Sequence, residues 1–204
     1  MPMADQGLVH GPLGPGALHL CVDMQRLFGP GYPWAMPWLE RVTPTIETIC
    51  GRHADRTLFT RFIPAARPGE GRGTWARYYQ RWADITLEKL DPEAVRIIPA
   101  LERFAPPARV LDKRVYSPWT EGQLDAMLAA SDIDTLVITG GETDVCVLAS
   151  ALGGIDRGFR VILVGDALCS FIDKTHDALM ELYLTRFTEQ LEVASAEEVL
   201  ENWR

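Results

Sequence analysis

The chain has 204 residues, a net charge of −8 and a hydrophobic fraction of 47%. This length supports one sizeable core, and the acidic balance argues against a nucleic-acid-binding protein, which usually carries a basic face. No apolar run in the sequence approaches the roughly 18 residues of a membrane span. We predict a cytoplasmic protein with a flexible leader over 1–16, which lacks the basic and apolar parts of a signal peptide, and a single domain over 17–204.

Short apolar runs alternate with helical patterns along the domain. Six apolar runs that end at polar residues or glycines predict strands, and these cover 17–22, 56–62, 109–112, 135–139, 160–164 and 191–194. Apolar residues at helical spacing predict the helices, at 39–49, 92–104, 120–130, 144–157 and 173–187, with a last helix capped by Ser195. Pro44 lies inside the first helix, where we expect a kink or a restart.

Strands that alternate with helices indicate an α/β protein. We predict three layers, in which a six-stranded, mostly parallel sheet of order 3-2-1-4-5-6 has helices on both faces. In such folds the ligand site lies beyond the carboxyl ends of the strands. The residues that directly follow each strand are therefore the first candidates for a functional site.

Three polar or reactive side chains follow predicted strands: Asp23, Lys113 and Cys146. Taken singly, each has an ordinary structural interpretation, because an aspartate can cap a turn and a cysteine can pack as a small hydrophobe. The setting of Cys146 favours chemistry, since Gly140 and Gly141 allow a tight reversal that puts it in the first turn of a helix. A helix N-terminus lowers a thiol pKa and offers free N–H groups to an oxyanion.

The other three cysteines lack this setting. Cys21 lies within a strand and Cys50 on a helix, so both are interpreted as packing residues. Cys169 also follows a strand and is the competing candidate, but no glycine turn precedes it and the next helix starts only near Asp173. The sequence has no C-x-x-C pair, and without a secretory signal we expect reduced thiols.

Three segments carry a resemblance to a known family. They read Cys-Val-Asp-Met-Gln at 21–25, Leu-Asp-Lys-Arg-Val-Tyr-Ser at 111–117 and Gly-Gly-Glu-Thr-Asp-Val-Cys-Val at 140–147. In this order, and on these strands, they resemble the isochorismatase-like cysteine hydrolases, the superfamily that includes nicotinamidases, N-carbamoylsarcosine amidase and biuret hydrolases. The stretch 166–170, followed by Asp173 and His176, also resembles the family's segment after strand five.

The resemblance implies an Asp-Lys-Cys triad that works without a cofactor. Asp23 would act as general base, Lys113 would hold Asp23 ionised and favour the thiolate, and Cys146 would attack a carbonyl to form a thioester. The backbone N–H groups of Glu142 and Cys146 would form the oxyanion hole. The Gly141–Glu142 peptide bond would be cis.

Two positions separate this chain from the metal-dependent nicotinamidases, which place an Asp and a His after strand two. The matching residues here are Phe62 and Pro64, and none of the four histidines has the spacing of a zinc site. We therefore predict no catalytic metal. True isochorismatases have no cysteine at the nucleophile position, so Cys146 favours C–N hydrolysis over their vinyl ether cleavage.

Candidates for the substrate pocket come first from position. Phe28 lies shortly after the first strand, and Tyr116 and Trp119 lie shortly after the third. Arg61 either binds a substrate carboxylate or lies at the surface. Aromatic walls suit a planar, heterocyclic or cationic substrate.

A second aromatic group lies in the long irregular stretch 64–91. Trp75, Tyr78, Tyr79 and Trp82 fit one helix, which either lines the pocket or packs on the core or a neighbouring subunit. The sequence leaves these alternatives open.

The leading hypothesis is a hydrolase that cleaves a C–N bond of a small amide, lactam, or ureido or N-carbamoyl compound through a thioester. The alternative is a thiol redox or sensor protein that uses Cys146 and Cys169. A nucleotide-binding module is poorly supported, because no strand is followed by G-x-G-x-x-G, and intact triad residues argue against a non-catalytic interaction protein. We expect a small-molecule substrate, no nucleic-acid or membrane partner, and a homo-oligomer, since the relatives are commonly dimers or tetramers.

Overall fold

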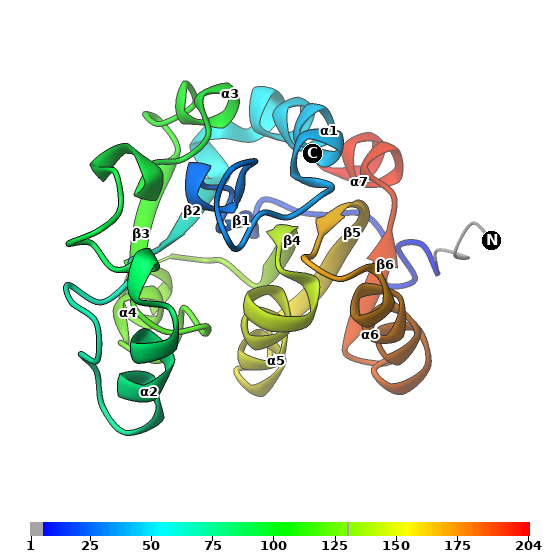
Figure 1. Ribbon diagram of the computed structural model, residues 1–204. Helices are drawn as coiled ribbons and strands as arrows, with labels where there is room; N and C mark the ends of the chain where they lie inside the picture. Colours follow the sequence, from blue (N-terminus) through cyan, green and yellow to red (C-terminus); the bar gives the residue numbers. More distant parts are fainter. Residues whose placement is uncertain (1–5, 130) are drawn as a thin grey trace.

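The computed structural model describes residues 6–129 and 131–204, and it contains one six-stranded sheet (Figure 1). The strands are β1 Ala17–Val22, β2 Thr57–Phe62, β3 Arg109–Lys113, β4 Thr135–Gly141, β5 Arg160–Cys169 and β6 Leu191–Ala194. Every neighbouring pair is parallel, and the order is β3-β2-β1-β4-β5-β6. This confirms the predicted α/β architecture and strand order.

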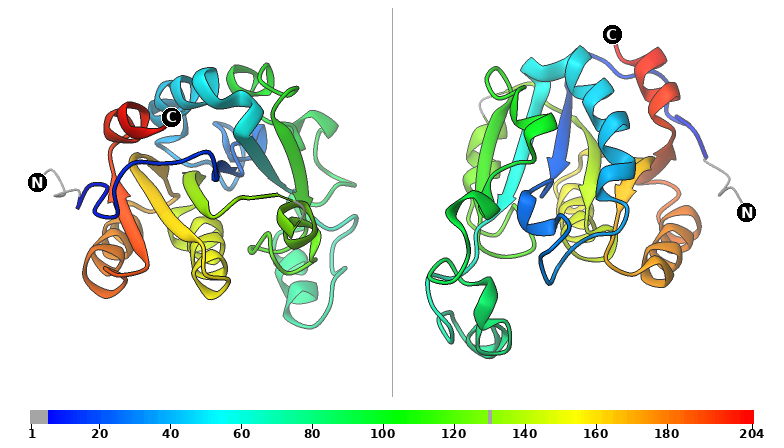
Figure 2. Two further views of the ribbon diagram at one scale, coloured as in Figure 1. Left: turned by 180° about the vertical axis from the view of Figure 1, so that it is seen from behind. Right: turned by 45° about the horizontal axis from the view of Figure 1, so that its top comes forward.

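Helices cover both faces of the sheet (Figure 1). One face carries α1 Leu39–His53, α3 Pro99–Glu102 and α7 Ala196–Asn202, and the other carries α4 Gln123–Ala129, α5 Leu148–Asp156 and α6 Asp173–Arg186. The helix α2 Thr74–Arg81 belongs to a segment that projects beyond the β3 side of the sheet (Figure 2). Within the described residues, no helix is both long and apolar enough to cross a bilayer.

Both faces of the central strands are apolar because both are covered. In β1, Cys21 packs into the layer beneath α1, whereas Leu20 and Val22 pack into the layer beneath α5. In β4, Val137 and Ile138 divide between the same two layers. Such near-continuous burial holds β1 and β4 rigidly side by side, so the residues that follow these two strands have fixed positions.

Two helix predictions need correction. Of the kink or restart expected at Pro44, the restart does not occur, because one helix runs from Leu39 to His53. The loss of one backbone donor in its second turn is outweighed by Ile46 and Ile49, which are fully buried against the sheet. The predicted helix 92–104 is instead a 3₁₀ turn, Pro92–Val95, followed by α3. Pro99 disfavours helical geometry at Ile98, and the Ile98 amide donates to the carbonyl of Met24 at 3.0 Å.

The other predicted helices agree with the structure to within a few residues. Helix α4 begins at Gln123, directly after Gly122, whose positive φ of 74° ends the preceding turn; residue 130 lies outside the described residues. The hydroxyl of Ser195 accepts the amide of Glu198 at 3.2 Å and caps α7, as predicted.

Residues 6–16 belong to the stretch that the sequence predicts as a leader, and the structure shows them against β6 and α7. The Gly7 amide donates to Val193 at 3.0 Å, and the Leu13 amide donates to Asn202 at 2.9 Å. Leu13 is 2% exposed and forms an isolated bridge with Trp203. The described part of the predicted leader is therefore packed on the domain.

Candidate active site

The carboxyl ends of β1, β3 and β4 meet at one point of the sheet edge. Asp23 directly follows β1 and has a positive φ of 50°, which is uncommon for a residue with a side chain. Gly140 near the end of β4 has a φ of 96°, and a Cβ there would come within 2.1 Å of the Val22 carbonyl oxygen. Only glycine permits this close approach of β4 to β1, which brings the turn after β4 next to Asp23.

The structure brings Asp23, Lys113 and Cys146 together at this point. The ammonium nitrogen of Lys113 lies 2.6 Å from an Asp23 carboxylate oxygen and donates to the Cys146 sulfur at 3.4 Å. All three side chains are buried, with exposed fractions of 0%, 2% and 6% in chain order. Lysine and aspartate are almost never this deeply buried without a partner, and here each is the other's partner.

Neighbouring polar groups fix the orientation of the pair. The Thr60 hydroxyl on β2 donates to the second Asp23 oxygen at 2.6 Å, and the Lys113 ammonium also donates to the Val115 carbonyl at 3.3 Å. Gln25 ties the β1 end to β2, because its side-chain amide accepts the Phe62 amide at 2.6 Å and donates to the Phe62 carbonyl at 3.1 Å. Sequence reasoning missed Thr60, because its role depends on strand pairing.

The site is deeply buried, and burial reverses the predicted direction of the shift in the thiol pKa. Burial raises the pKa of the Cys146 thiol well above its ordinary range, although the Lys113 ammonium acts in the opposite direction. Burial lowers the pKa of Lys113, but Asp23 and Cys146 outweigh it, so that the net shift is upward. The expected lowering of the thiol pKa by the helix N-terminus is therefore wrong. The site holds an ammonium–carboxylate pair beside a protonated thiol.

The turn that carries Cys146 differs from the predicted helix start. The Gly141–Glu142 peptide bond is cis, as expected, and a single π-helical turn, Thr143–Val147, precedes α5. The Glu142 carbonyl accepts the amides of Val145 at 3.1 Å and Val147 at 3.0 Å. In the sequence, the amide of Cys146 lies between these two donors.

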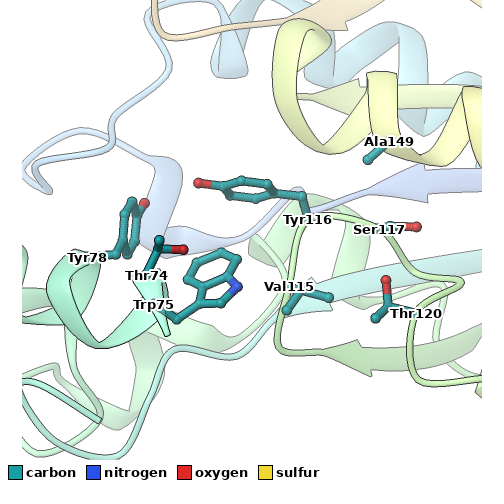
Figure 3. Close-up of a pocket in the computed structure, with 8 residues that line it drawn as sticks. All are labelled: Thr74, Trp75, Tyr78, Val115, Tyr116, Ser117, Thr120 and Ala149. Atoms are coloured by element: carbon teal, nitrogen blue, oxygen red, sulfur yellow. The ribbon is translucent and has the colours of Figure 1, made fainter. Parts of the chain in front are cut away.

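A small cavity of about 90 Å³ opens above the Cys146 sulfur. Its lining is mostly aromatic and comes from five separate parts of the chain: Phe28, Trp34, Phe62, Tyr78, Tyr116, Glu142, Val145 and Cys146. We call this cavity the inner pocket. Tyr78 and Tyr116 also line a wider outer pocket of about 570 Å³. Figure 3 shows the Tyr116 ring extending toward Tyr78, with Trp75 beside them.

The predicted pocket residues divide into two groups. Phe28 and Tyr116 line the inner pocket, and Trp75 lines the outer one. The sequence contains no indication of Trp34 as a pocket residue. It drew attention to Phe62 only because this residue occupies the position of an aspartate metal ligand in the metal-dependent nicotinamidases. Trp34 lies in a loop that has neither helical nor strand periodicity. The only signals for a pocket position were its aromatic side chain and its distance of six residues from Phe28.

Two predicted pocket residues in the 64–91 stretch are corrected. Tyr79 is 3% exposed and lines a separate hollow behind α2, with Ile63 and Leu87. Trp82 supports the inner pocket from behind, because its ring lies edge-on to Trp34 with 5.9 Å between centroids. On a short helix these side chains point in different directions, so α2 both lines the pockets and packs on the core.

Trp119 and Arg61 also lie away from the inner pocket. The indole of Trp119 is buried beneath α5 and donates to the Ser150 carbonyl at 3.0 Å. Arg61 forms two hydrogen bonds with Asp112 on the neighbouring strand, at 2.7 and 2.9 Å. Side chains alternate along a strand, so Phe62 points into the pocket and Arg61 points away from it.

Cys169 and His176 lie behind the turn that carries the nucleophile candidate. Cys169 is fully buried, its thiol faces the Met36 sulfur at 3.6 Å, and burial raises its pKa. His176, in the first turns of α6, lies 2.8 Å from the Thr143 hydroxyl. In the described part of the chain, no three His, Cys, Asp or Glu side chains are placed to share a metal ion.

The fold agrees with comparisons to known proteins. The family model "Isochorismatase domain" matches residues 17–195, so the chain belongs to the isochorismatase family. Nicotinamidase 3 of Arabidopsis thaliana is 27% identical over 163 residues, which are 79% of this chain and 77% of that protein.

Solved structures share the whole architecture. A cysteine hydrolase from Pseudomonas syringae superposes with a TM-score of 0.79 and 25% identity over 98% of both chains. The N-carbamoylsarcosine amidase from Thermoplasma acidophilum superposes with a TM-score of 0.71 and 19% identity, over 89% of this chain and 96% of that one. The latter likeness is one of fold.

Proposed function

We propose that this chain is a cysteine hydrolase that cleaves a C–N bond of a small amide, lactam, or ureido or N-carbamoyl compound. The observation that carries the proposal is the Lys113 ammonium, which lies 2.6 Å from the Asp23 carboxylate and 3.4 Å from the sulfur of Cys146, a residue that lines the inner pocket. The nicotinamidase and the cysteine hydrolase among its relatives support this reaction class.

The first half-reaction forms a thioester. Asp23 accepts the thiol proton as the Cys146 sulfur attacks the carbonyl carbon. Because the thiol is protonated at rest, this transfer is part of the attack, and Lys113 stabilises the negative charge on sulfur as it develops. The amides of Glu142 and Cys146 donate to the oxyanion. When the C–N bond breaks, the proton held by Asp23 passes to the leaving nitrogen.

The second half-reaction releases the acid. Asp23 takes a proton from a water molecule that attacks the thioester carbonyl, and the same amides stabilise the second oxyanion. The C–S bond then breaks, and the proton returns from Asp23 to the Cys146 sulfur. The pair of Asp23 and Lys113 therefore ends each cycle in its starting state.

A panel of small compounds tests this proposal. Primary amides, N-carbamoyl amines and lactams are incubated with the protein, and ammonia or amine release is followed. We expect turnover of at least one class, and hydroxylamine should divert the thioester to a hydroxamate. Reversible thiol oxidation without turnover of any class would overturn the proposal and favour the redox alternative.

Removal of metal tests the chemistry separately. The Phe62 ring lies at the carboxyl end of β2, with its centroid 5.2 Å from the Lys113 ammonium, and it offers no ligand atom there. We expect full activity after dialysis against a chelator. A loss of activity that added zinc restores would contradict a metal-free mechanism.

A further inference from the structure

The Glu142 side chain has no role in the mechanism above, which uses only its backbone. Glu142 nevertheless lines the inner pocket, next to Cys146. Its carboxyl group acts on Tyr78 and Tyr116, which line the same pocket, and contributes to raising the pKa of both. Among the lining residues it is the only acidic side chain, and no lysine or arginine lines this cavity. The structure records no hydrogen bond or ion pair for this carboxyl group among the described residues, so it faces the pocket without a partner.

Aromatic rings surround the space in front of Glu142. Trp34 stacks on Phe28 with 6.3 Å between centroids, and it meets Phe62 edge-on at 6.0 Å and Tyr78 at 5.8 Å. The faces of such rings carry partial negative charge and attract cations, most strongly where water is excluded. The rings and the carboxyl group therefore favour the same kind of ligand.

The charge balance of the site also favours a cationic ligand. The positive charge of Lys113 is matched by Asp23, and the Cys146 thiol is protonated, so these three groups are together neutral. An ionised Glu142 adds a negative charge that no lysine or arginine in the pocket lining compensates. A cation in the inner pocket would supply the missing partner at close range, in surroundings where water screens poorly.

Burial raises the pKa of Glu142 to about 7, and the nearby carboxylates of Asp144 and Asp23 add to this effect. The ionisable groups that face Glu142 from the elements packed around it are Asp23, Tyr78, Tyr116, Asp144, Cys146 and Cys169. None of these groups is a cation, and the nearby Lys113 ammonium, 5.2 Å from the centroid of the Phe62 ring, is paired with Asp23 at 2.6 Å. A bound cation would therefore draw the carboxyl group into its ionised form.

We propose that the substrate carries a positive charge, and that the Glu142 carboxylate and the surrounding aromatic rings select it. This inference rests on the proposed hydrolase function and deepens it, because it names the substrate class. Glu142 is thus a specificity-determining residue, while the triad supplies the chemistry.

Two isosteric amides separate charge from shape. The amide of glycine betaine carries a quaternary ammonium group, and tert-butylacetamide has a carbon atom in place of that nitrogen. We expect the wild-type protein to have the higher kcat/KM for the cationic amide. Glu142→Gln keeps the shape of the side chain and should reduce the cationic-to-neutral ratio of kcat/KM by about tenfold or more, as expected for a desolvated charge contact.

The pH dependence of the same ratio identifies the group responsible. The quaternary ammonium does not titrate, and the triad acts on both amides, so its titration cancels in the ratio. In the wild type the ratio should rise as pH increases through about 7, because Glu142 loses its proton there. In Glu142→Gln the ratio should stay flat, and Glu181→Gln, which removes one exposed carboxylate on α6, should behave as wild type.

Competition provides a second measurement that does not need cationic turnover. Tetramethylammonium should inhibit hydrolysis of the neutral amide by the wild type, and Glu142→Gln should weaken this inhibition. Equal ratios in wild type and Glu142→Gln, or a wild-type preference for the neutral amide, would overturn the substrate class while leaving the hydrolase intact. If neither amide nor any member of the wider panel is hydrolysed, the proposed function itself fails.

Discussion

Cys146 follows β4, and Cys169 is the last residue of the neighbouring parallel strand β5. Both thiols are buried, and burial raises the pKa of both. Their partners differ. The sulfur of Cys146 faces the ammonium of Lys113 at 3.4 Å, whereas the sulfur of Cys169 faces the thioether of Met36 at 3.6 Å. Burial alone therefore does not distinguish the two thiols, and the charged pair beside Cys146 is the feature that supports the nucleophilic role proposed for it.

Removing each thiol in turn gives the largest expected contrast. Cys146→Ala should lower kcat/KM by about 10⁴-fold or more, since the loss of a nucleophile abolishes covalent catalysis. Cys169→Ala should retain most of the activity, because its sulfur lies outside the inner pocket. Ammonia release from the best amide of the panel measures both. An inactive Cys169→Ala with an active Cys146→Ala would reverse the assignment.

Replacing the partner of each thiol tests the comparison through stability. Lys113→Met leaves the buried Asp23 carboxylate without its cation, and should reduce the free energy of unfolding by about 3–5 kcal/mol. Met36→Leu keeps the volume and the apolar character beside Cys169, and should cost less than about 1.5 kcal/mol. Urea unfolding measures both losses. Equal losses would mean that the charged pair contributes no more than packing does.

Alkylation compares the accessibility and ionisation of the two thiols. The thiolate is the reacting form, and burial raises the pKa of Cys146, so labelling by iodoacetamide should be slow at mildly acidic pH and speed up as pH rises. Cys146 opens to the inner pocket, so it should be labelled about tenfold faster than Cys169, which is fully buried. Mass spectrometry of the peptides measures each rate. A Cys146 rate already at its plateau near pH 6 would restore the low thiol pKa expected from the sequence.

The smallest effect concerns the stability of the Cys169 variant. Cys169→Ala removes one buried sulfur atom and should cost about 1 kcal/mol, comparable to the loss of one buried methylene with a small cavity. Urea unfolding at neutral pH measures it, with Cys50→Ala as a matched control that removes another fully buried sulfur. A much larger loss for Cys169→Ala would show that the contact with Met36 organises the turn behind Cys146.

The fold could be predicted because each central strand has a local sequence signal, a continuous apolar run. A run such as 135–139 is apolar on both faces, and only a covered parallel strand accommodates that pattern. The helix predicted over 92–104 failed for a tertiary reason, since the Ile98 amide pairs with Met24, far away in sequence. Local periodicity does not reveal such a contact.

The candidate site likewise has residues that could be predicted from the sequence and residues that could not. Asp23, Lys113 and Cys146 each follow a strand, and one rule about strand ends brings them together. Trp34 and the side chain of Glu142 escaped notice, because their place in the pocket depends on loop conformation. The state of the Cys146 thiol was predicted with the wrong sign, because a helix N-terminus is visible in the sequence and the depth of burial is not.

The bridge between Leu13 and Trp203 joins segments from opposite regions of the chain. During synthesis, Leu13 is made early and must wait for its partner, which at 5–20 residues per second takes roughly 10–40 s. Throughout that interval the apolar Leu13 side chain is exposed, and the backbone of Gly7 has no β6 to pair with. The stretch 6–13 can therefore reach its place only after β6 and α7 have been synthesised.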